Sequence, residues 1–182
     1  MTITHLITAG ELESMGSDAR FELIQGVLHE MSPSSFDSSR VLSRIALAMG
    51  GYVEAHRLGE VTFAEAGFVL ERDPDSVVAP DIAFIQTERL RLAPQGQGYF
   101  PAAPDLIVEV ISPTDEPLEI RRKQALYDRV GIPLVWWIDP KRRTATVHAP
   151  DRPVRRLGET DELEGESIVP GFSLQLAKLF DF

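Results

Sequence analysis

The chain has 182 residues, of which 43% are hydrophobic, and this is enough for a single domain with a sizeable core over residues 1–182. It contains no cysteine, which excludes disulfides and cysteine-ligated zinc. No segment reaches the ~18 apolar residues of a membrane span, and the first residues lack a basic region followed by an apolar one, so we expect a cytoplasmic protein without membrane contact. The net charge of −10 argues against strong nonspecific binding to nucleic acid, which rests on a basic surface.

The first third of the chain predicts a short helix, a tight β-hairpin and a long amphipathic helix. The expected ranges are 8–15 for the first helix, 20–24 and 27–31 for the strands of the hairpin, and 38–57 for the second helix. The pair Gln25-Gly26 is typical of a tight turn between two strands. The second helix has apolar residues at helical spacing, and Ser38 or Ser39 can cap it.

The remainder predicts strands on both sides of one further helix, as expected of an α/β fold (α+β mixed) whose central mixed sheet is flanked by helices. The expected strands are 60–64, 67–71, 82–85, 106–111, 134–138 and 144–148, and the helix is 117–130. Residues 86–104 form a long connection, interpreted as a functional flap, a dimer contact or a plain surface loop. Residues 151–182 predict an exposed hairpin over 157–166 and an amphipathic segment over 172–180 that docks on the core or on a second subunit.

Lys123 lies where the third predicted helix, which Thr114 or Asp115 can cap, needs an apolar side chain. At about 100° per residue, Ile120 and Tyr127 share one apolar stripe with it. The chain has three lysines and fifteen arginines, so composition does not explain a lysine on that stripe. A buried ammonium is costly unless it meets an anion, and we therefore expect a carboxylate partner.

Two acidic residues are placed to meet this lysine. Glu109 interrupts the β-branched run of the strand over 106–111, and the alternation of side chains puts it on one face with Asp105. Asp81 stands at the beginning of the preceding strand, after a proline. Asp105 rivals Asp81 as the second acid, but four residues along one strand separate it from Glu109 by ~13 Å. We therefore prefer Asp81.

Asp81, Glu109 and Lys123 form an acid, acid, lysine set that suits metal-dependent hydrolysis. Two carboxylates with room for water suit Mg²⁺ or Mn²⁺, and the lysine can position a metal-bound water. Such a site supports phosphodiester hydrolysis, because the metal lowers the pKa of water and neutralises charge on the phosphate. The alternative is a structural ion pair between helix and sheet, in a noncatalytic module that serves in interaction or assembly.

Several short motifs occur in an order that resembles the Uma2 family (DUF820), a large bacterial family placed in the PD-(D/E)XK nuclease superfamily. The motifs cover about residues 5–150 and are Phe21-Glu-Leu-Ile-Gln-Gly26, Met31-Ser-Pro33, Ala79-Pro-Asp81, Pro104-Asp-Leu-Ile-Val-Glu-Val-Ile-Ser-Pro113, Lys123, Tyr127, Gly131 and Trp136-Trp-Ile-Asp-Pro140. The resemblance implies a restriction-endonuclease-like fold with an N-terminal β-hairpin. It also implies an endonuclease that hydrolyses nucleic acid, with DNA favoured, in the presence of Mg²⁺ or Mn²⁺.

The resemblance further implies roles for four residues. Asp81 and Glu109 correspond to the acids that bind the metal. Lys123 corresponds to the lysine of the superfamily motif, displaced from position 111 to the following helix. Glu22 corresponds to an early glutamate that approaches the metal or its water.

Other residues receive weaker assignments. Ser38 stands about where many relatives carry a histidine, so its role near the site can differ. Tyr127 is expected to hydrogen-bond near the site or to pack in the core. Arg121 and Arg122 belong to the stretch 117–143, which has seven basic and three acidic residues and hence a local charge of +4 that can contact nucleic acid; the alternative is a solvated helix surface. Cleavage of two strands would also favour a homodimer.

Overall fold

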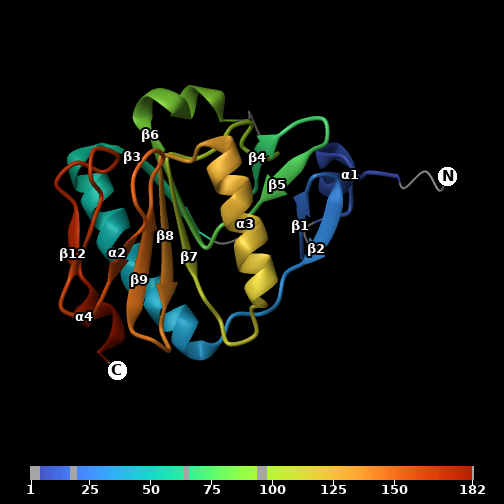
Figure 1. The fold of residues 1–182 in the computed structure, drawn as a ribbon. Coiled ribbons are helices and arrows are strands. Elements are labelled where there is room, and N and C mark those ends of the chain that lie inside the picture. The colour runs from blue at the N-terminus through green and yellow to red at the C-terminus, as the bar shows by residue number, and fades with distance from the viewer. Residues whose placement is uncertain (1–4, 17–19, 64–65, 94–97, 182) are drawn as a thin grey trace.

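The structure of the protein is a computed structural model that describes residues 5–16, 20–63, 66–93 and 98–181. A mixed sheet of six strands, in the order β10-β9-β8-β7-β6-β3, runs through its centre (Figure 1). The strands are β3 Gly59–Phe63, β6 Ile82–Gln86, β7 Leu106–Val110, β8 Leu134–Asp139, β9 Thr144–His148 and β10 Arg155–Leu157. The pair β7–β8 is parallel and the other four pairs are antiparallel, which confirms the predicted mixed sheet.

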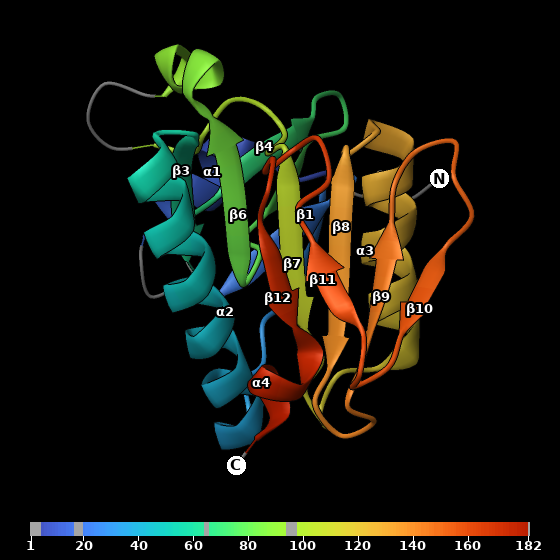
Figure 2. The same cartoon turned by 90° about the vertical axis from the view of Figure 1, so that its left-hand side faces the viewer.

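Helices cover both faces of this sheet (Figure 2). On one face lie α2 (Phe36–His56) and α4 (Leu176–Phe180), and on the other lies α3 (Pro117–Val130). The helix α3 connects β7 to β8, because two parallel strands need a crossover. Trp136 is buried on the α2 face and Trp137 on the α3 face, as the alternation of side chains along a strand predicts. No helix in the described part of the chain is long and apolar enough to cross a membrane.

A second sheet of four strands, in the order β2-β1-β5-β4, packs beside α3 and carries the N-terminal hairpin. Its strands are β1 Phe21–Ile24, β2 Val27–Glu30, β4 Phe68–Glu71 and β5 Ser76–Val78, and α1 (Ala9–Ser14) covers it. Gln25 and Gly26 both have positive φ, 50° and 75°, as a type I′ turn requires. The predicted hairpin is therefore confirmed.

The helix caps differ from the prediction. The helix α2 is capped by Ser35, whose Oγ accepts a hydrogen bond from the Ser38 amide, rather than by Ser38 or Ser39. Apart from the exposed Phe36 its first turn is polar, so the buried apolar pattern begins only one turn inside the helix. The cap of α3 is Glu116, since Asp115 instead accepts a hydrogen bond from the Ser112 amide at 2.8 Å.

Two short elements escaped prediction. The strand β5 has only three residues, too few for a periodic pattern. The connection over 86–104 begins with a 3-10 helix, η1 (Thr87–Leu92), and residues 94–97 of it lie outside the described residues. Arg89 ties η1 to the sheet by donating to the Asp105 carboxylate at 2.8 Å.

The C-terminal hairpin was predicted with the wrong pairing. The strand β10 joins β9 at the edge of the main sheet, whereas β11 (Glu162–Glu164) pairs with β12 (Ser173–Gln175). The turn-rich residues 157–166 suggested a local hairpin, whereas β11 pairs with a strand that follows it after a longer connection. The final helix α4 fully buries Leu179 and Phe180, so the terminal segment docks on the core of its own chain.

Candidate active site

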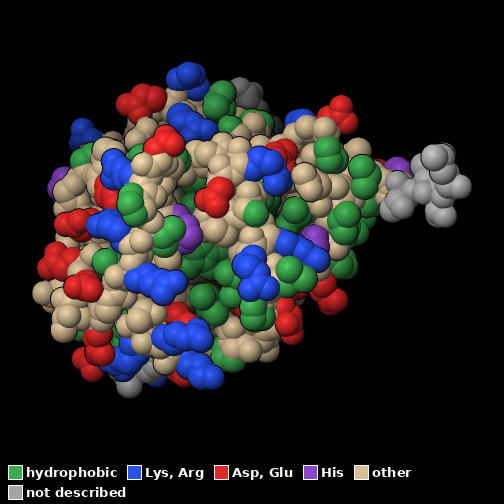
Figure 3. All heavy atoms as spheres, in the orientation of Figure 1, with side chains coloured by type: hydrophobic (Ala, Val, Ile, Leu, Met, Phe, Trp, Pro, Cys, Tyr) green, Lys and Arg blue, Asp and Glu red, His purple; other side chains and the backbone are tan. Residues whose placement is uncertain are grey.

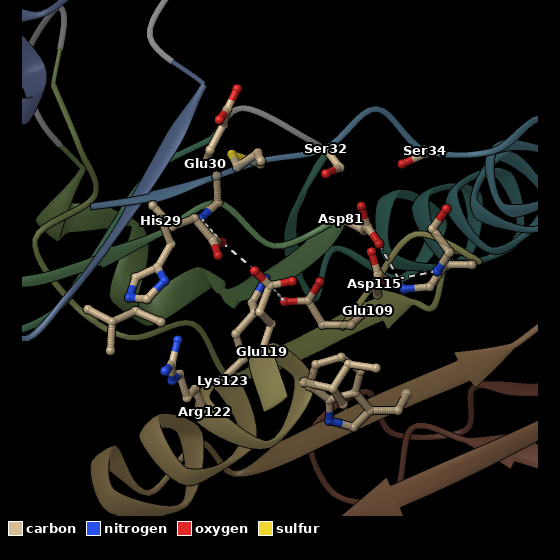
Figure 4. Close-up of a pocket in the computed structure, with 18 residues that line it drawn as sticks. His29, Glu30, Ser32, Ser34, Asp81, Glu109, Asp115, Glu119, Arg122 and Lys123 are labelled. Carbon is tan, nitrogen blue, oxygen red and sulfur yellow. Dashed lines mark hydrogen bonds and ion pairs between the residues drawn. The ribbon is translucent and has the colours of Figure 1, made fainter. Parts of the chain in front are cut away.

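The four residues that the sequence indicated most strongly lie in one pocket. The pocket has a volume of about 130 Å³ and lies between the hairpin of β1 and β2, the end of β7 and the first turns of α3 (Figure 4). Glu22, Asp81, Glu109 and Lys123 all line it. They come from the hairpin, from the beginning of β6, from β7 and from α3, so the fold joins segments up to 101 positions apart.

Lys123 is the positive centre of the pocket. Its Nζ lies 2.7 Å from Glu109 Oε1 and donates to Glu22 Oε1 at 3.0 Å. The Lys123 side chain is 17% exposed and both glutamates are 8% exposed, so this contact is shielded from bulk water. The predicted carboxylate partner of Lys123 is therefore present, and there are two of them.

Backbone pairing positions the acids. In the antiparallel pair of β6 and β7, Ile82 lies opposite Val108, and the next step of that register puts Asp81 beside Glu109. Asp81 Oδ2 accepts a hydrogen bond from the Val110 amide at 2.7 Å, which fixes one oxygen of the carboxylate. In Figure 4, Asp81 and Glu109 point into the same part of the pocket. Two acids on adjacent strands thus share one space.

The site contains more negative than positive charge. Burial raises the pKa of the Glu109 carboxyl to about 7, with the nearby Asp81 and Glu22 carboxylates adding to the shift and Lys123 opposing it. Burial also raises the pKa of Asp81. Burial by itself lowers the pKa of Lys123, but Glu109 and Glu22 outweigh it and hold that pKa well above its usual value. The pKa values of all three groups are therefore raised, those of the two acids mainly by burial and that of Lys123 by its carboxylate partners.

Tyr127 and Ser38 do not line the pocket, but both form hydrogen bonds to residues at the end of β7 that borders it. The Tyr127 hydroxyl donates to Glu109 Oε1 at 2.5 Å, and its ring is buried against the sheet, so it both packs and hydrogen-bonds. Burial, together with the Glu109 charge, holds the pKa of Tyr127 well above its usual value. Ser38 does not line the pocket: its hydroxyl donates to the Ile111 carbonyl at 3.1 Å and so fastens the beginning of α2 to the end of β7.

The sequence patterns did not predict several of the residues that line the pocket, and they predicted another role for one of them. Asp115 was interpreted only as a helix cap, yet it lines the pocket and burial raises its pKa. The sequence held one signal for it. Asp115 lies in the short connection between the end of β7 and the start of α3, and such a connection stays at the edge of the sheet where Glu109 also lies. The other polar residues of the pocket are His29, Glu30, Ser32, Ser34, Ser112, Glu119 and Arg122.

The basic stretch of residues 117–143 does not form a continuous track. Lys123, Arg129, Arg142 and Arg143 are held in ion pairs with acids of this chain. Figure 3 shows basic and acidic side chains interspersed over this face. Arg121 and Arg122 are both exposed, and of the two only Arg122 lines the pocket.

The donor set fits a hard divalent cation that keeps several waters. Among the described residues, no three Asp, Glu or His side chains form a ready-made cage for a metal ion. Mg²⁺ is commonly bound through one or two carboxylates with water and substrate oxygens, and Asp81 and Glu109 supply such a pair. With all groups ionised, Glu22, Asp81, Glu109 and Lys123 have a net charge of −2, which a divalent cation would offset.

The fold and the site together define a restriction-endonuclease-like α/β domain with an acid, acid, lysine set at one end of its mixed sheet. The chain belongs to the Uma2 family, described as "Putative restriction endonuclease", whose sequence profile matches residues 9–177. The match extends beyond the range of 5–150 that the motifs covered. A crystal structure of a "putative nuclease belonging to DUF820" from Anabaena variabilis has a TM-score of 0.83 and 20% identity, covering 96% of this chain and 98% of that one. No curated protein matches the chain.

Proposed function

We propose that this protein is an endonuclease that hydrolyses phosphodiester bonds of nucleic acid, with DNA as its substrate and Mg²⁺ or Mn²⁺ as its cofactor. The observation that carries the proposal is the excess of carboxylates around a single lysine in an open pocket. A structural ion pair needs one acid for one base, whereas this pocket has two carboxylates on Lys123 and Asp81 beside them. The family description is consistent with this activity.

Asp81 and Glu109 would hold the cation, with water and the substrate completing its shell. When bound, the cation would lower the pKa of a water nucleophile and offset charge that develops on the phosphate. Asp81 is prepared for this role because the Val110 amide occupies only one of its two oxygens.

Lys123 acts as a fixed positive charge rather than as a base. Its raised pKa keeps the amine protonated at neutral pH, so it cannot accept a proton from water. The ammonium can donate hydrogen bonds to an attacking water or to a phosphate oxygen, and charge that develops in the transition state is stabilised by donors already in place. Lys123 thus orients and stabilises the reacting groups.

Glu22 and Tyr127 hold the reacting groups in place. Glu22 accepts hydrogen bonds through one oxygen from both Lys123 Nζ and the Ala79 amide, each at 3.0 Å, and so ties the lysine to the residue that follows β5. Tyr127 remains protonated at neutral pH and donates to Glu109. In this arrangement Glu22 also faces the pocket, where it can assist the attacking water.

A noncatalytic interaction module is the second candidate, and two observations favour it. The ion pairs of Lys123 join α3 to β1 and β7, so they stabilise the packing of this helix whether or not a cation binds. The net charge of −10 also disfavours contact with nucleic acid. Metal binding separates the two candidates, because an ion pair that only stabilises the fold has no need of a cation.

The test is cleavage of plasmid and single-stranded DNA in Mg²⁺, Mn²⁺ or EDTA. We expect metal-dependent cleavage by the wild-type protein and its loss in Lys123→Ala. Lys141→Ala is the matched control, since Lys141 is an exposed lysine in a turn. Thermal unfolding of each variant reports whether it is folded. No cleavage and no metal binding by the folded wild-type protein would favour the noncatalytic module.

A further inference from the structure

Phe36, the first residue of α2, exposes 78% of its surface. The Arg40 guanidinium lies 5.7 Å from the centroid of its ring, a cation–π contact that helps to hold the ring in place. Leu47 on the same helix is 79% exposed, so exposure alone does not distinguish Phe36. Phe36 differs from Leu47 in its closeness to the pocket.

Phe36 is close to the pocket along the chain, although it does not itself line it. Ser34 lines the pocket two residues earlier, a separation of at most ~7 Å along the backbone. The Ser35 amide donates at 3.3 Å to the hydroxyl of Ser112, which also lines the pocket. On α3, the pocket residue Glu119 is preceded by Leu118, which is 51% exposed. Exposed apolar side chains therefore stand in the first turn of α3, which lines the pocket, and in the first turn of α2, which begins two residues after the pocket residue Ser34.

Acids are also present where a substrate must enter. Glu30 and Glu119 are exposed and Asp115 is half-buried, and all three line the pocket in addition to the deeper acids (Figure 4). Double-stranded DNA carries one negative charge per 1.7 Å of its axis, whereas a single strand carries half that density. These acids therefore repel a duplex more than a single strand.

The depth of the site has the same consequence. The side chains of Glu22 and Glu109 are each only 8% exposed, so a phosphate must enter a pocket of about 130 Å³ to come close to them. A flexible single strand can bend a phosphate inward and turn its unpaired bases outward. Unpaired bases stack on exposed aromatic rings, and this interaction tolerates any base because every base has a π-face.

We propose that the pocket takes a single-stranded segment of DNA and that Phe36 stacks on a base beside the bound phosphate. This inference rests on the proposed function, because it assumes that the pocket binds a phosphodiester. It adds the strandedness of the substrate and a residue that binds it outside the acid, acid, lysine set.

The test compares Phe36→Ala, Phe36→Trp and Leu47→Ala, the last as a control of matched exposure on the same helix. Binding is measured by anisotropy of a fluorescein-labelled single strand and of the same strand annealed to its complement. The Lys123→Ala background prevents cleavage during this measurement. Steady-state cleavage of both DNA forms in Mn²⁺, with Lys123 intact, then separates kcat from KM.

We expect the single strand to bind more tightly than the duplex and Phe36→Ala to weaken single-strand binding about 10-fold. The loss should appear in KM, Phe36→Trp should restore it, and Leu47→Ala should behave as wild type. Equal binding of duplex and single strand, or equal effects of Phe36→Ala and Leu47→Ala, would overturn the inference. Single-strand binding that depends on Phe36, without cleavage in any metal, would instead overturn the proposed hydrolysis and leave this inference standing.

Discussion

The two ends of β7 each bury an acid on the same face, and the two acids are treated differently. At one end, Asp105 accepts hydrogen bonds from Arg89 at 2.8 Å and from the Gln86 amide at 2.9 Å, while Arg89 also donates to the Ala103 carbonyl. At the other end, Glu109 shares Lys123 with Glu22 and lies beside Asp81.

The Asp105 end has the features of a structural ion pair, and the Glu109 end those expected of the proposed metal site. Asp105 and Arg89 balance one another, and hydrogen bonds join them to the backbone. The Glu109 end has two carboxylates more than its ammonium can neutralise, and burial, with the Asp81 and Glu22 charges adding to it, raises the pKa of Glu109 to about 7. Buried carboxylates without enough positive charge to neutralise them weaken the folded state. Buried acids with a raised pKa of this kind are typical of functional sites.

The largest expected effect is on cleavage, and it should distinguish the two ends of β7. Asp81→Asn removes a carboxylate at the Glu109 end and should lower the rate of DNA cleavage on the order of 1,000-fold, because the proposed cation would lose one of its two carboxylate ligands. Asp105→Asn should lower the thermal stability but leave the rate per folded molecule within a few-fold of wild type. Equal rates for the two variants would contradict the assignment.

The pH dependence of stability should differ next most strongly. In the folded protein the pKa of Glu109 lies at about 7, above its ordinary 4.5, so ionisation weakens the fold as pH rises from 4.5 through 7. Glu109→Gln removes this loss. Between pH 5 and pH 8, its free energy of unfolding should therefore gain roughly 3 kcal/mol relative to wild type.

Urea denaturation at the two pH values measures this difference. Arg89→Ala is the control from the other end of the strand. It leaves Asp105 buried without its guanidinium and should cost about 2 kcal/mol at both pH values. A Glu109→Gln protein that tracks wild type across this range would show that Glu109 ionises freely in the fold.

Tyr127→Phe should have an intermediate effect. It removes the hydroxyl that donates to Glu109 and keeps the ring that packs on the sheet. Groups that orient metal ligands typically affect metal affinity 10- to 100-fold, and we expect about 10-fold weaker Mn²⁺ binding by calorimetry. Unchanged affinity would mean that Tyr127 serves packing alone.

The smallest effect concerns the exposed arginines. Arg122→Ala should weaken DNA binding a few-fold and reduce its salt dependence, because Arg122 lines the pocket. Arg121→Ala, its exposed neighbour outside the pocket, should change binding less. Anisotropy titrations at several salt concentrations compare the two, and a larger effect of Arg121 would place the DNA outside the pocket.

Local periodicity predicted half of the site. The apolar stripe of α3 placed Lys123 toward the protein, and the alternation along β7 placed Glu109 on the matching face. Both patterns depend only on residues close in sequence. Asp81 followed from its position at a strand start, although its register opposite Glu109 needed the fold.

The remainder of the site depends on contacts that sequence patterns do not record. Glu22 entered through the family resemblance, because its approach to Lys123 requires a second sheet whose strand β5 was not predicted. Asp115 was missed because its role as a helix cap already explained it. The structural pairing of Arg89 with Asp105 was missed because η1 shows no periodic pattern.

The most direct test of the account is a calorimetric titration of Mn²⁺ into the wild-type protein, Asp81→Asn and Asp105→Asn at pH 8, where Glu109 is ionised. We expect binding by the wild-type protein and by Asp105→Asn, and loss of binding in Asp81→Asn. Absence of binding by the wild-type protein, or equal binding by Asp81→Asn, would contradict a metal site at the Glu109 end of β7.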